Sequence, residues 1–182
     1  MHAGEAAELV RYVAAARAGE QPAFAYLHRR FLPLVHGVMI AHVGPSQADD
    51  LCQECFIAAF GALSGLKDAA AFPAWLYRIA QRTATHARAQ PWLPLDGTEP
   101  ADAGQDPQRL TEAGRVLAAL HRLPEAYRET VALRLVEGLT GPEIAVLCGL
   151  TPDSVRVNLH RGVRRLRALL DITPEEDRHG QA

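Results

Sequence analysis

The sequence predicts an all-α protein made of two small helical domains joined by a flexible linker. Alanine is abundant, whereas the strand formers isoleucine, threonine, tyrosine and phenylalanine are few, a mix that favours helices. No segment alternates polar and apolar residues with the period of two that a half-buried strand needs. A proline- and glycine-rich stretch at residues 90–108 separates two runs of helical pattern.

The first domain is expected at residues 1–89 and should hold four helices. Glycine and proline mark the helix ends: Gly19 ends the first helix, and Gly44 with Pro45 ends the second. Ser46 is expected to cap the third helix, with Asp49 three residues later in an acidic variant of the capping box. The four helices are expected over residues 5–18, 22–43, 46–63 and 72–89.

The linker is expected to be extended, because each of its four prolines removes a backbone donor and pushes the preceding residue out of the helical region. Trp92, Leu93 and Leu95 are the apolar exceptions within it, and they would either pack on a neighbouring domain or touch a partner. A second helical domain then follows at residues 109–170. An acidic tail at residues 171–182 ends the sequence.

Composition excludes several classes of protein. With 182 residues, 48% of them hydrophobic, the chain has enough apolar surface for a folded core. No apolar run approaches the roughly 18 residues that span a bilayer, and the first residues lack the basic start and apolar core of a signal peptide. Three cysteines do not form a disulfide framework, which fits a reducing cytoplasm. We therefore expect a cytoplasmic protein.

Charge is unevenly distributed along the chain. Residues 115–170 carry a net charge of +4, whereas residues 96–114 carry −4 and residues 171–182 carry −3. A basic block of this kind indicates a nucleic-acid interface. The acidic flanks should weaken non-specific DNA binding by the free protein, because they cancel part of its field.

The second domain carries the sharpest local pattern, over residues 140–170. Helices are expected at 109–121, 125–137, 140–147 and 152–170. Thr140 and Glu143 form a Thr-x-x-Glu capping box, Gly149 can take the positive φ of a tight turn, and Thr151 caps the last helix. Two short helices joined by a glycine turn, the second of them cationic, predict a helix-turn-helix.

The last helix would enter the major groove of DNA. Its buried stripe is expected at Val155, Leu159, Leu166 and Leu170. Arg156 can fork to a guanine, Asn158 can pair with an adenine edge, and the later arginines are better placed for phosphates. A helical hairpin with a solvated arginine face is the alternative. The residues expected on the DNA-binding side are Ser154, Arg156, Val157, Asn158, His160, Arg161, Arg164 and Arg165.

Two faces stand out in the first domain. On the third helix Asp50, Gln53, Glu54 and Ile57 share one face, which is either solvated or a protein-contact surface. The fourth helix combines aromatic and cationic residues, a combination that suits stacking on unpaired bases and holding a backbone. We expect Trp75 to be a core anchor more than a base contact. The candidates on the fourth helix are Trp75, Tyr77, Arg78, Gln81, Arg82 and Thr85, with all but Trp75 expected to face outward.

Together these stretches resemble the bacterial extracytoplasmic-function (ECF) sigma factors. Asp-Asp-Leu-Cys-Gln-Glu-Cys-Phe at 49–56 is similar to the core-binding helix of the family's region 2, and the segment 72–80 resembles its promoter-melting helix. Leu-Pro-Glu-x-x-Arg at 123–128, the segment 133–139 and the helix-turn-helix look like region 4. The resemblance covers residues 8–89 and 115–170.

The resemblance implies a function in transcription initiation without catalysis or a cofactor. The face of Asp50, Gln53, Glu54 and Ile57 would bind the clamp helices of the RNA polymerase β′ subunit. The loop at residues 66–71 and the helix at 75–88 would open the −10 element, with a base held in a pocket. The helix at 152–165 would read the −35 element, and the linker would pass near the polymerase active-site channel. Core RNA polymerase, including its β subunit, and promoter DNA are the implied partners, and an anti-sigma factor is a further one.

Two alternatives remain open. A helix-turn-helix regulator of another kind would share the second domain, but it would not bind core polymerase. A metal or redox protein would use Cys52 and Cys55, with His36, His42 or Cys148 as helpers. Both cysteines of the pair fall on the expected buried side of a helix, where cysteine acts as a small hydrophobe, and no second pair supports a metal site. No nucleophile motif supports an enzyme.

Overall fold

The computed structural model describes residues 3–89, 111–136 and 138–171. Every regular element within these ranges is helical, as the sequence predicts. The linker at 90–108 and the tail beyond Asp171 lie outside the described residues, so the predictions made for them stay predictions. Within the described part of the chain, no helix is long and apolar enough to cross a membrane.

The first half contains four α-helices and two short 3₁₀ turns. Gly19 has a φ of +89° at the end of the first helix, as its expected stop role requires. The third helix begins one residue earlier than expected, because Gly44 is its N-cap and Pro45 takes the first position, so the expected cap at Ser46 is wrong. The helices are α1 (Ala3–Arg17), α2 (Gln21–Val43), α3 (Pro45–Ala62) and α4 (Phe72–Ala89), with η1 (Leu63–Gly65) and η2 (Ala69–Ala71) between the last two.

The second half contains four further helices. Thr111 caps α5 by accepting a hydrogen bond from the Gly114 amide at 3.1 Å. The Thr140–Glu143 capping box, the positive φ of Gly149 (+67°) and the Thr151 cap are all present as predicted. These helices are α5 (Glu112–His121), α6 (Glu125–Val136), α7 (Gly141–Cys148) and α8 (Pro152–Leu169).

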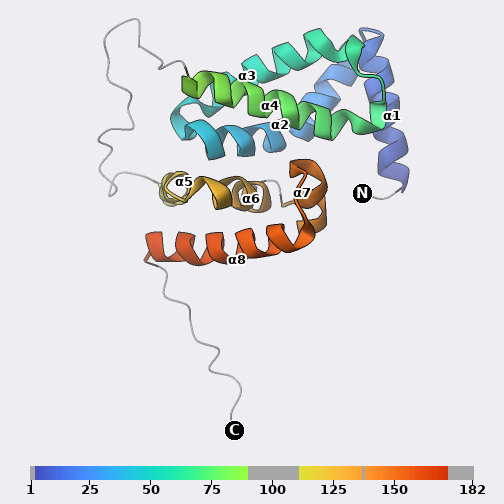
Figure 1. The fold of residues 1–182 in the computed structure, drawn as a ribbon. Coiled ribbons are helices and arrows are strands. Elements are labelled where there is room, and N and C mark those ends of the chain that lie inside the picture. The colour runs from blue at the N-terminus through green and yellow to red at the C-terminus, as the bar shows by residue number, and fades with distance from the viewer. Residues whose placement is uncertain (1–2, 90–110, 137, 172–182) are drawn as a thin grey trace, which may run out of the picture.

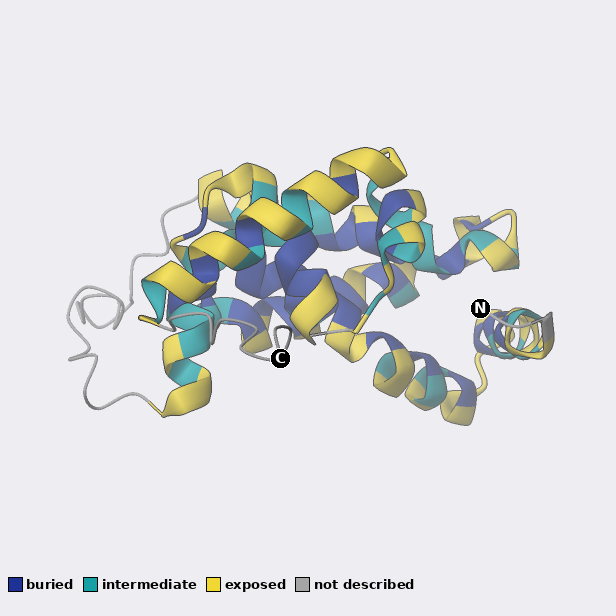
Figure 2. Cartoon of the chain, turned by 90° about the horizontal axis from the view of Figure 1, so that it is seen from below, coloured by how far each residue is buried: buried dark blue, intermediate teal, exposed yellow. Residues whose placement is uncertain are grey.

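The two halves pack against each other around one continuous hydrophobic core. Figure 1 shows α2, α3 and α4 above, α5 and α6 below them, and α8 as the lowest layer. Helix α2 is the central element, since it contacts α1, α3 and α4 of its own half and also α5 and α6. Buried residues line the inner faces of the helices and exposed residues the outer faces (Figure 2). This contact between the halves could not be read from helical periodicity.

Candidate polymerase and nucleic-acid interfaces

Helix α3 presents the four residues expected at the polymerase contact on its solvent side. Asp50, Gln53, Glu54 and Ile57 are all exposed, and the Ile57 side chain is 72% exposed. The opposite side of the helix is buried as expected, with Leu51, Cys52, Cys55, Phe56 and Ala59 in the core. An exposed isoleucine amid acidic and amide groups forms a surface with a small apolar centre and a polar rim, which is typical of protein contacts.

The cysteine pair of α3 lies inside the first half. Burial raises the pKa of Cys52 to about 12 and that of Cys55 to about 11, so both thiols are protonated at neutral pH. Within residues 3–89, 111–136 and 138–171, no three His, Cys, Asp or Glu side chains are grouped so as to hold a metal ion. The pair therefore packs as small hydrophobes in the core.

The face expected on α4 is divided into two edges. Arg78, Arg82 and Thr85 are exposed, whereas Trp75 and Gln81 are half-buried. Tyr77 is only 2% exposed, so the expectation that it faces outward is wrong. It is covered because α4 contacts α7 of the second half along this edge. Trp75 packs beside the fully buried Phe72, with ring centroids 5.8 Å apart, in keeping with an anchoring role.

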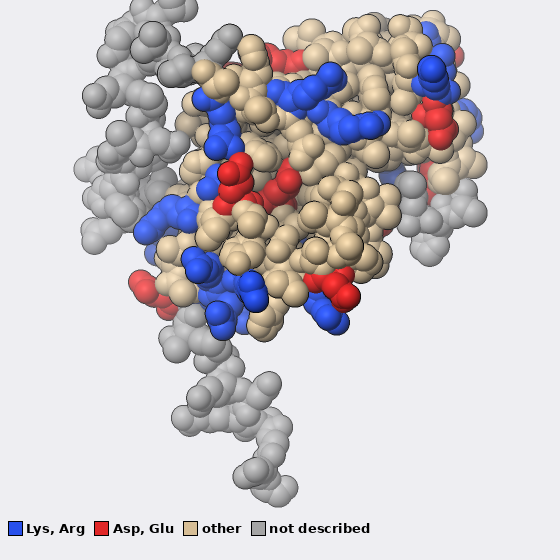
Figure 3. Space-filling view, viewed as in Figure 1, with Lys and Arg blue, Asp and Glu red and all other residues tan. Residues whose placement is uncertain are grey.

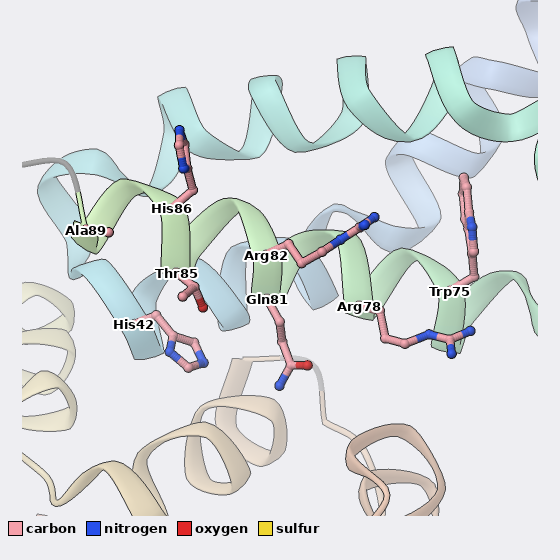
Figure 4. Close-up of a pocket in the computed structure, with 8 residues that line it drawn as sticks. All are labelled: His42, Trp75, Arg78, Gln81, Arg82, Thr85, His86 and Ala89. Atoms are coloured by element: carbon pink, nitrogen blue, oxygen red, sulfur yellow. The ribbon is translucent and has the colours of Figure 1, made fainter.

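An open groove of about 930 Å³ runs along α4 (Figure 4). Gln81 and His42 point toward the second half of the chain, while Trp75 and His86 point the other way. His42 comes from α2, so the periodicity of α4 could not have identified it. The groove combines an indole, two guanidinium groups and several hydrogen-bonding groups, which can hold a single strand by stacking and by backbone contacts. Its lining residues are His42, Trp75, Arg78, Gln81, Arg82, Thr85, His86 and Ala89.

Tyr77 takes part in a buried polar network at the inner edge of α4. Gln81 Nε2 donates to the Tyr77 hydroxyl at 2.9 Å and to Glu129 Oε1 at 3.3 Å. The Tyr77 hydroxyl is also hydrogen-bonded to the side chain of Cys148 on α7. Burial raises the pKa of Tyr77, and the neighbouring Glu129 carboxylate raises it further. Burial likewise raises the pKa of Cys148 to about 11.

Helix α8 presents its predicted DNA-binding side to solvent. All eight predicted residues are exposed except Asn158, which is half-buried. The expected buried stripe holds at Val155 and Leu166, while Leu159 and Leu170 are partly buried against the core. Arg156 Nη2 lies 3.1 Å from Asp153 Oδ1, and both side chains are largely exposed. Such a surface pair is worth at most about 1 kcal/mol, so it leaves Arg156 free to turn toward DNA.

A glycine that the sequence reasoning passed over sets the position of α8. Gly162 is buried against α6, and a Cβ built on it would lie 2.5 Å from Val131 Cγ2 and 3.1 Å from Tyr127 Cβ. The backbones of α6 and α8 therefore approach more closely than any larger residue would permit. The helical spacing indicates this buried position, because residue 162 lies seven positions after Val155 and four before Leu166, on the buried side of the helix.

Basic side chains are exposed on both halves of the chain. Figure 3 shows arginines over the upper layer of helices and over the lower one, with acidic side chains between them. Arg78 and Arg82 are exposed on α4, and Arg161, Arg164 and Arg165 are exposed on α8. Two cationic surfaces on different halves of one chain suit two separate DNA contacts.

Comparison with known proteins links each half to one family. The "Sigma-70 region 2" family model matches residues 27–92, and the "Sigma-70, region 4" model matches residues 113–166. The RNA polymerase sigma factor CarQ of Myxococcus xanthus is 34% identical over 161 residues, covering 85% of this chain and 92% of CarQ. The ECF RNA polymerase sigma factor SigD of Mycobacterium tuberculosis is 36% identical over 171 residues, covering 85% of this chain and 80% of SigD.

Solved structures agree with these relatives. CnrH, in complex with the cytosolic domain of CnrY, superposes with a TM-score of 0.67 at 28% identity, covering 90% of this chain and 97% of CnrH. RpoE from Bartonella quintana, in complex with the anti-sigma factor NepR, has a TM-score of 0.59 at 21% identity, covering 82% and 97%, and so supports the fold. Region 2 and region 4 thus follow in order on one chain, which belongs to the extracytoplasmic-function family of RNA polymerase sigma factors and directs promoter-specific transcription initiation.

Proposed function

We propose that three helix faces each make one of the contacts needed for transcription initiation. The exposed face of α3, with Asp50, Gln53, Glu54 and Ile57, docks on the β′ clamp helices of core RNA polymerase. The groove along α4 receives the −10 strand, and α8 reads the −35 element in the major groove. The observation that carries the proposal is the coexistence of exposed faces on α3 and α8 and an open groove along α4, in a chain with both sigma regions.

The −10 step depends on the chemistry of the α4 groove. A base turned out of the duplex loses stacking and pairing worth a few kcal/mol, which contacts in the protein must offset. The partly buried indole of Trp75 and the exposed guanidinium groups of Arg78 and Arg82 supply a stacking surface and two cations for the strand. The polymerase supplies the catalytic chemistry.

The −35 step depends on the N-terminal turns of α8. Arg156 and Asn158 lie in these turns, where a recognition helix meets base edges. Arg161, Arg164 and Arg165 follow on later turns and are placed for phosphates.

The proposal includes two statements about the cellular setting. The protein acts in the cytoplasm, where the polymerase is. An anti-sigma factor is a further partner, since RpoE, which has the same fold, is solved in complex with the anti-sigma factor NepR, and the similar CnrH is solved in complex with the cytosolic domain of CnrY.

Run-off transcription with core polymerase on a genomic promoter library tests the proposed function. We expect the chain to direct transcription from a subset of promoters that share two short elements. Transcription that is no higher than with core polymerase alone would contradict the proposal. The same assay supplies the promoter sequences used in the experiments below.

A double substitution tests the polymerase contact. Asp50→Ala with Gln53→Ala should weaken binding to core polymerase while leaving helical content unchanged, because both side chains are exposed on α3. Glu20→Ala with Gln21→Ala is the matched control, since it also removes one exposed carboxylate and one exposed amide, but far from α3 in sequence. Equal core affinity of the two double variants would refute the assignment of the α3 face.

A further inference from the structure

One surface of α6 makes side-chain contacts with the first half of the chain. Glu125 Oε1 accepts from Arg88 Nη1 at 2.8 Å, and Arg128 Nη1 donates to the Ala41 carbonyl at 3.0 Å. Glu129 Oε1 accepts from Gln81 Nε2 and lies 3.2 Å from His42 Nε2. Glu125, Arg128 and Glu129 are spaced by three and four residues, so they occupy a single face of the helix.

Glu129 differs from Glu125 on that face in burial and in what it contacts. Its side chain is 20% exposed, and the His42 imidazole is 15% exposed, whereas the Arg88–Glu125 pair is open to solvent at 46% and 64%. An exposed pair of this kind contributes little to stability. The Glu129 carboxylate instead lies at the buried seam, where its hydrogen bonds to side chains of α2 and α4 are stronger than they would be in water.

The donors that Glu129 engages belong to the groove proposed to bind the −10 strand. Gln81 and His42 both line the groove. The same contact between the two halves buries Tyr77. The outer edge of the groove, with Arg78 and Arg82, stays exposed. A DNA strand would bring acceptor oxygens to these donors, and a carboxylate oxygen already occupies two of them.

We propose that Glu129 is an internal competitor of the −10 strand, and that it adds to the apolar packing of α2 on α5 and α6 in holding the two halves closed, so that the inner edge of α4 must be uncovered before DNA can bind there. This inference rests on the proposed function of α4. In the closed state α8 keeps its DNA-binding side in solvent, so the restraint acts on one DNA contact and not on the other. Opening need not unfold either half, because α4 and α8 each pack within their own half as well.

The reactivity of Cys148 reports whether the two halves are closed. Cys148 is half-buried at the seam against Tyr77, whereas Cys52 and Cys55 are buried within the first half. Opening of the halves removes the cover that α4 gives to Cys148 and leaves the other two thiols buried. Labelling with a thiol-reactive maleimide, resolved by residue in a mass spectrometer, therefore separates opening from unfolding.

The experiment compares Glu129→Ala with wild type and with Glu112→Ala, which removes an exposed carboxylate from α5. Two quantities are measured on the free chain of residues 1–182: the labelling rate of Cys148 and the affinity for a single-stranded −10 oligonucleotide. Apparent affinity falls in proportion to the fraction of molecules in the competent state. If the open state makes up about 1–10% of wild type, Glu129→Ala should raise both quantities by about tenfold to a hundredfold. Glu112→Ala should change neither.

The labelling rate of Cys148 and the affinity for the −10 oligonucleotide test different parts of the proposal. Unchanged labelling and unchanged affinity in Glu129→Ala would overturn the closing role of Glu129. Faster labelling with unchanged affinity would overturn the competition with DNA. Faster labelling of Cys52 and Cys55 together with Cys148 would mean that Glu129→Ala unfolds the chain. Glu129→Gln, which keeps an acceptor oxygen, then replaces it: smaller increases in Cys148 labelling and in affinity support the proposal, and no change in either overturns it. Labelling requires no DNA, so a failure of the −10 assignment leaves the closing role separately measurable.

Discussion

The two helices proposed to bind DNA differ in what surrounds them. One side of α8 packs on α5, α6 and α7, and its predicted DNA-binding side is exposed. Helix α4 has a buried side in its own half and a second covered edge, at Tyr77, against the other half. The difference teaches that two helices with similar amphipathic patterns can be unequally available for binding. The contact between the two halves of the chain, and not the amphipathic pattern of the helix, determines how much of the helix is available for binding.

The largest effect we expect comes from Arg156 on the exposed helix. Arg156→Ala should cost about 1–3 kcal/mol of holoenzyme binding at one −35 position and relax the preference there, because we propose that the guanidinium forks to a guanine. Arg78→Ala on α4 is the comparison, and it should weaken binding to all −10 variants about equally and lower the salt slope by about one. Holoenzyme affinities across every single-base promoter variant at two salt concentrations measure both.

One result would show that Arg156 and Arg78 contact DNA in the same way. A uniform loss across all −35 variants for Arg156→Ala would make Arg156 a phosphate contact like Arg78. The exposed helix would then place its cations without reading bases through this residue.

A somewhat smaller effect should follow from filling the contact between α6 and α8. Gly162→Ala should lower the free energy of unfolding by about 1–2 kcal/mol, because overpacking costs about 1–3 kcal/mol and alanine regains up to about 1 kcal/mol of helix propensity. Gly61→Ala in α3 is the matched control, since a Cβ there meets nothing within 4 Å. It should be neutral or stabilising by up to about 1 kcal/mol. Urea unfolding measures both, and equal changes would contradict the close packing of α8.

The smallest effect concerns how the helices begin. The Thr140 amide and hydroxyl donate to Glu143 Oε2 at 2.9 and 2.7 Å, whereas α3 begins without a side-chain cap. Glu143→Ala should cost up to about 1 kcal/mol at pH 7. The hydrogen bonds from Thr140 lower the pKa of Glu143 from 4.5. The contribution is therefore full at neutral pH and is lost as the pH falls through that lowered pKa.

Urea unfolding of wild type and Glu143→Ala at pH 7 and in acid tests this prediction. The gap between the two proteins should narrow as the pH falls below 4.5. A gap that stays constant over that range would mean that the ionised carboxylate does not stabilise the start of α7.

Much of the local structure could be predicted from the sequence, because glycine, proline and capping residues act within a few positions of themselves. The Thr140–Glu143 box, the Gly149 turn and the Thr151 cap are confirmed for this reason. The cap at Ser46 was wrong because Gly44 and Pro45 start the helix first. Proline is favoured at the first helical position, so the helix starts at Pro45. Ser46 then lies two residues after the N-cap and cannot itself be the cap.

The parts that could not be predicted depend on residues distant in sequence. The helical pattern predicts Tyr77 on the outside because one helix shows only one apolar stripe, whereas its cover comes from residues such as Cys148, 71 positions later. His42 joins the α4 groove from a different helix. The roles assigned to the exposed residues of α3, α4 and α8 remain predictions.

The most direct test measures how core polymerase changes the two DNA contacts of the wild-type chain. Affinities for a −35 duplex and for a −10 single strand, both taken from the promoters found by run-off transcription, are measured for the free chain and for the holoenzyme. We predict that core polymerase raises the affinity for the −10 strand by at least about tenfold more than the affinity for the −35 duplex, because only the α4 edge has to be uncovered. Equal gains for both ligands, or a larger gain for the −35 duplex, would contradict the account.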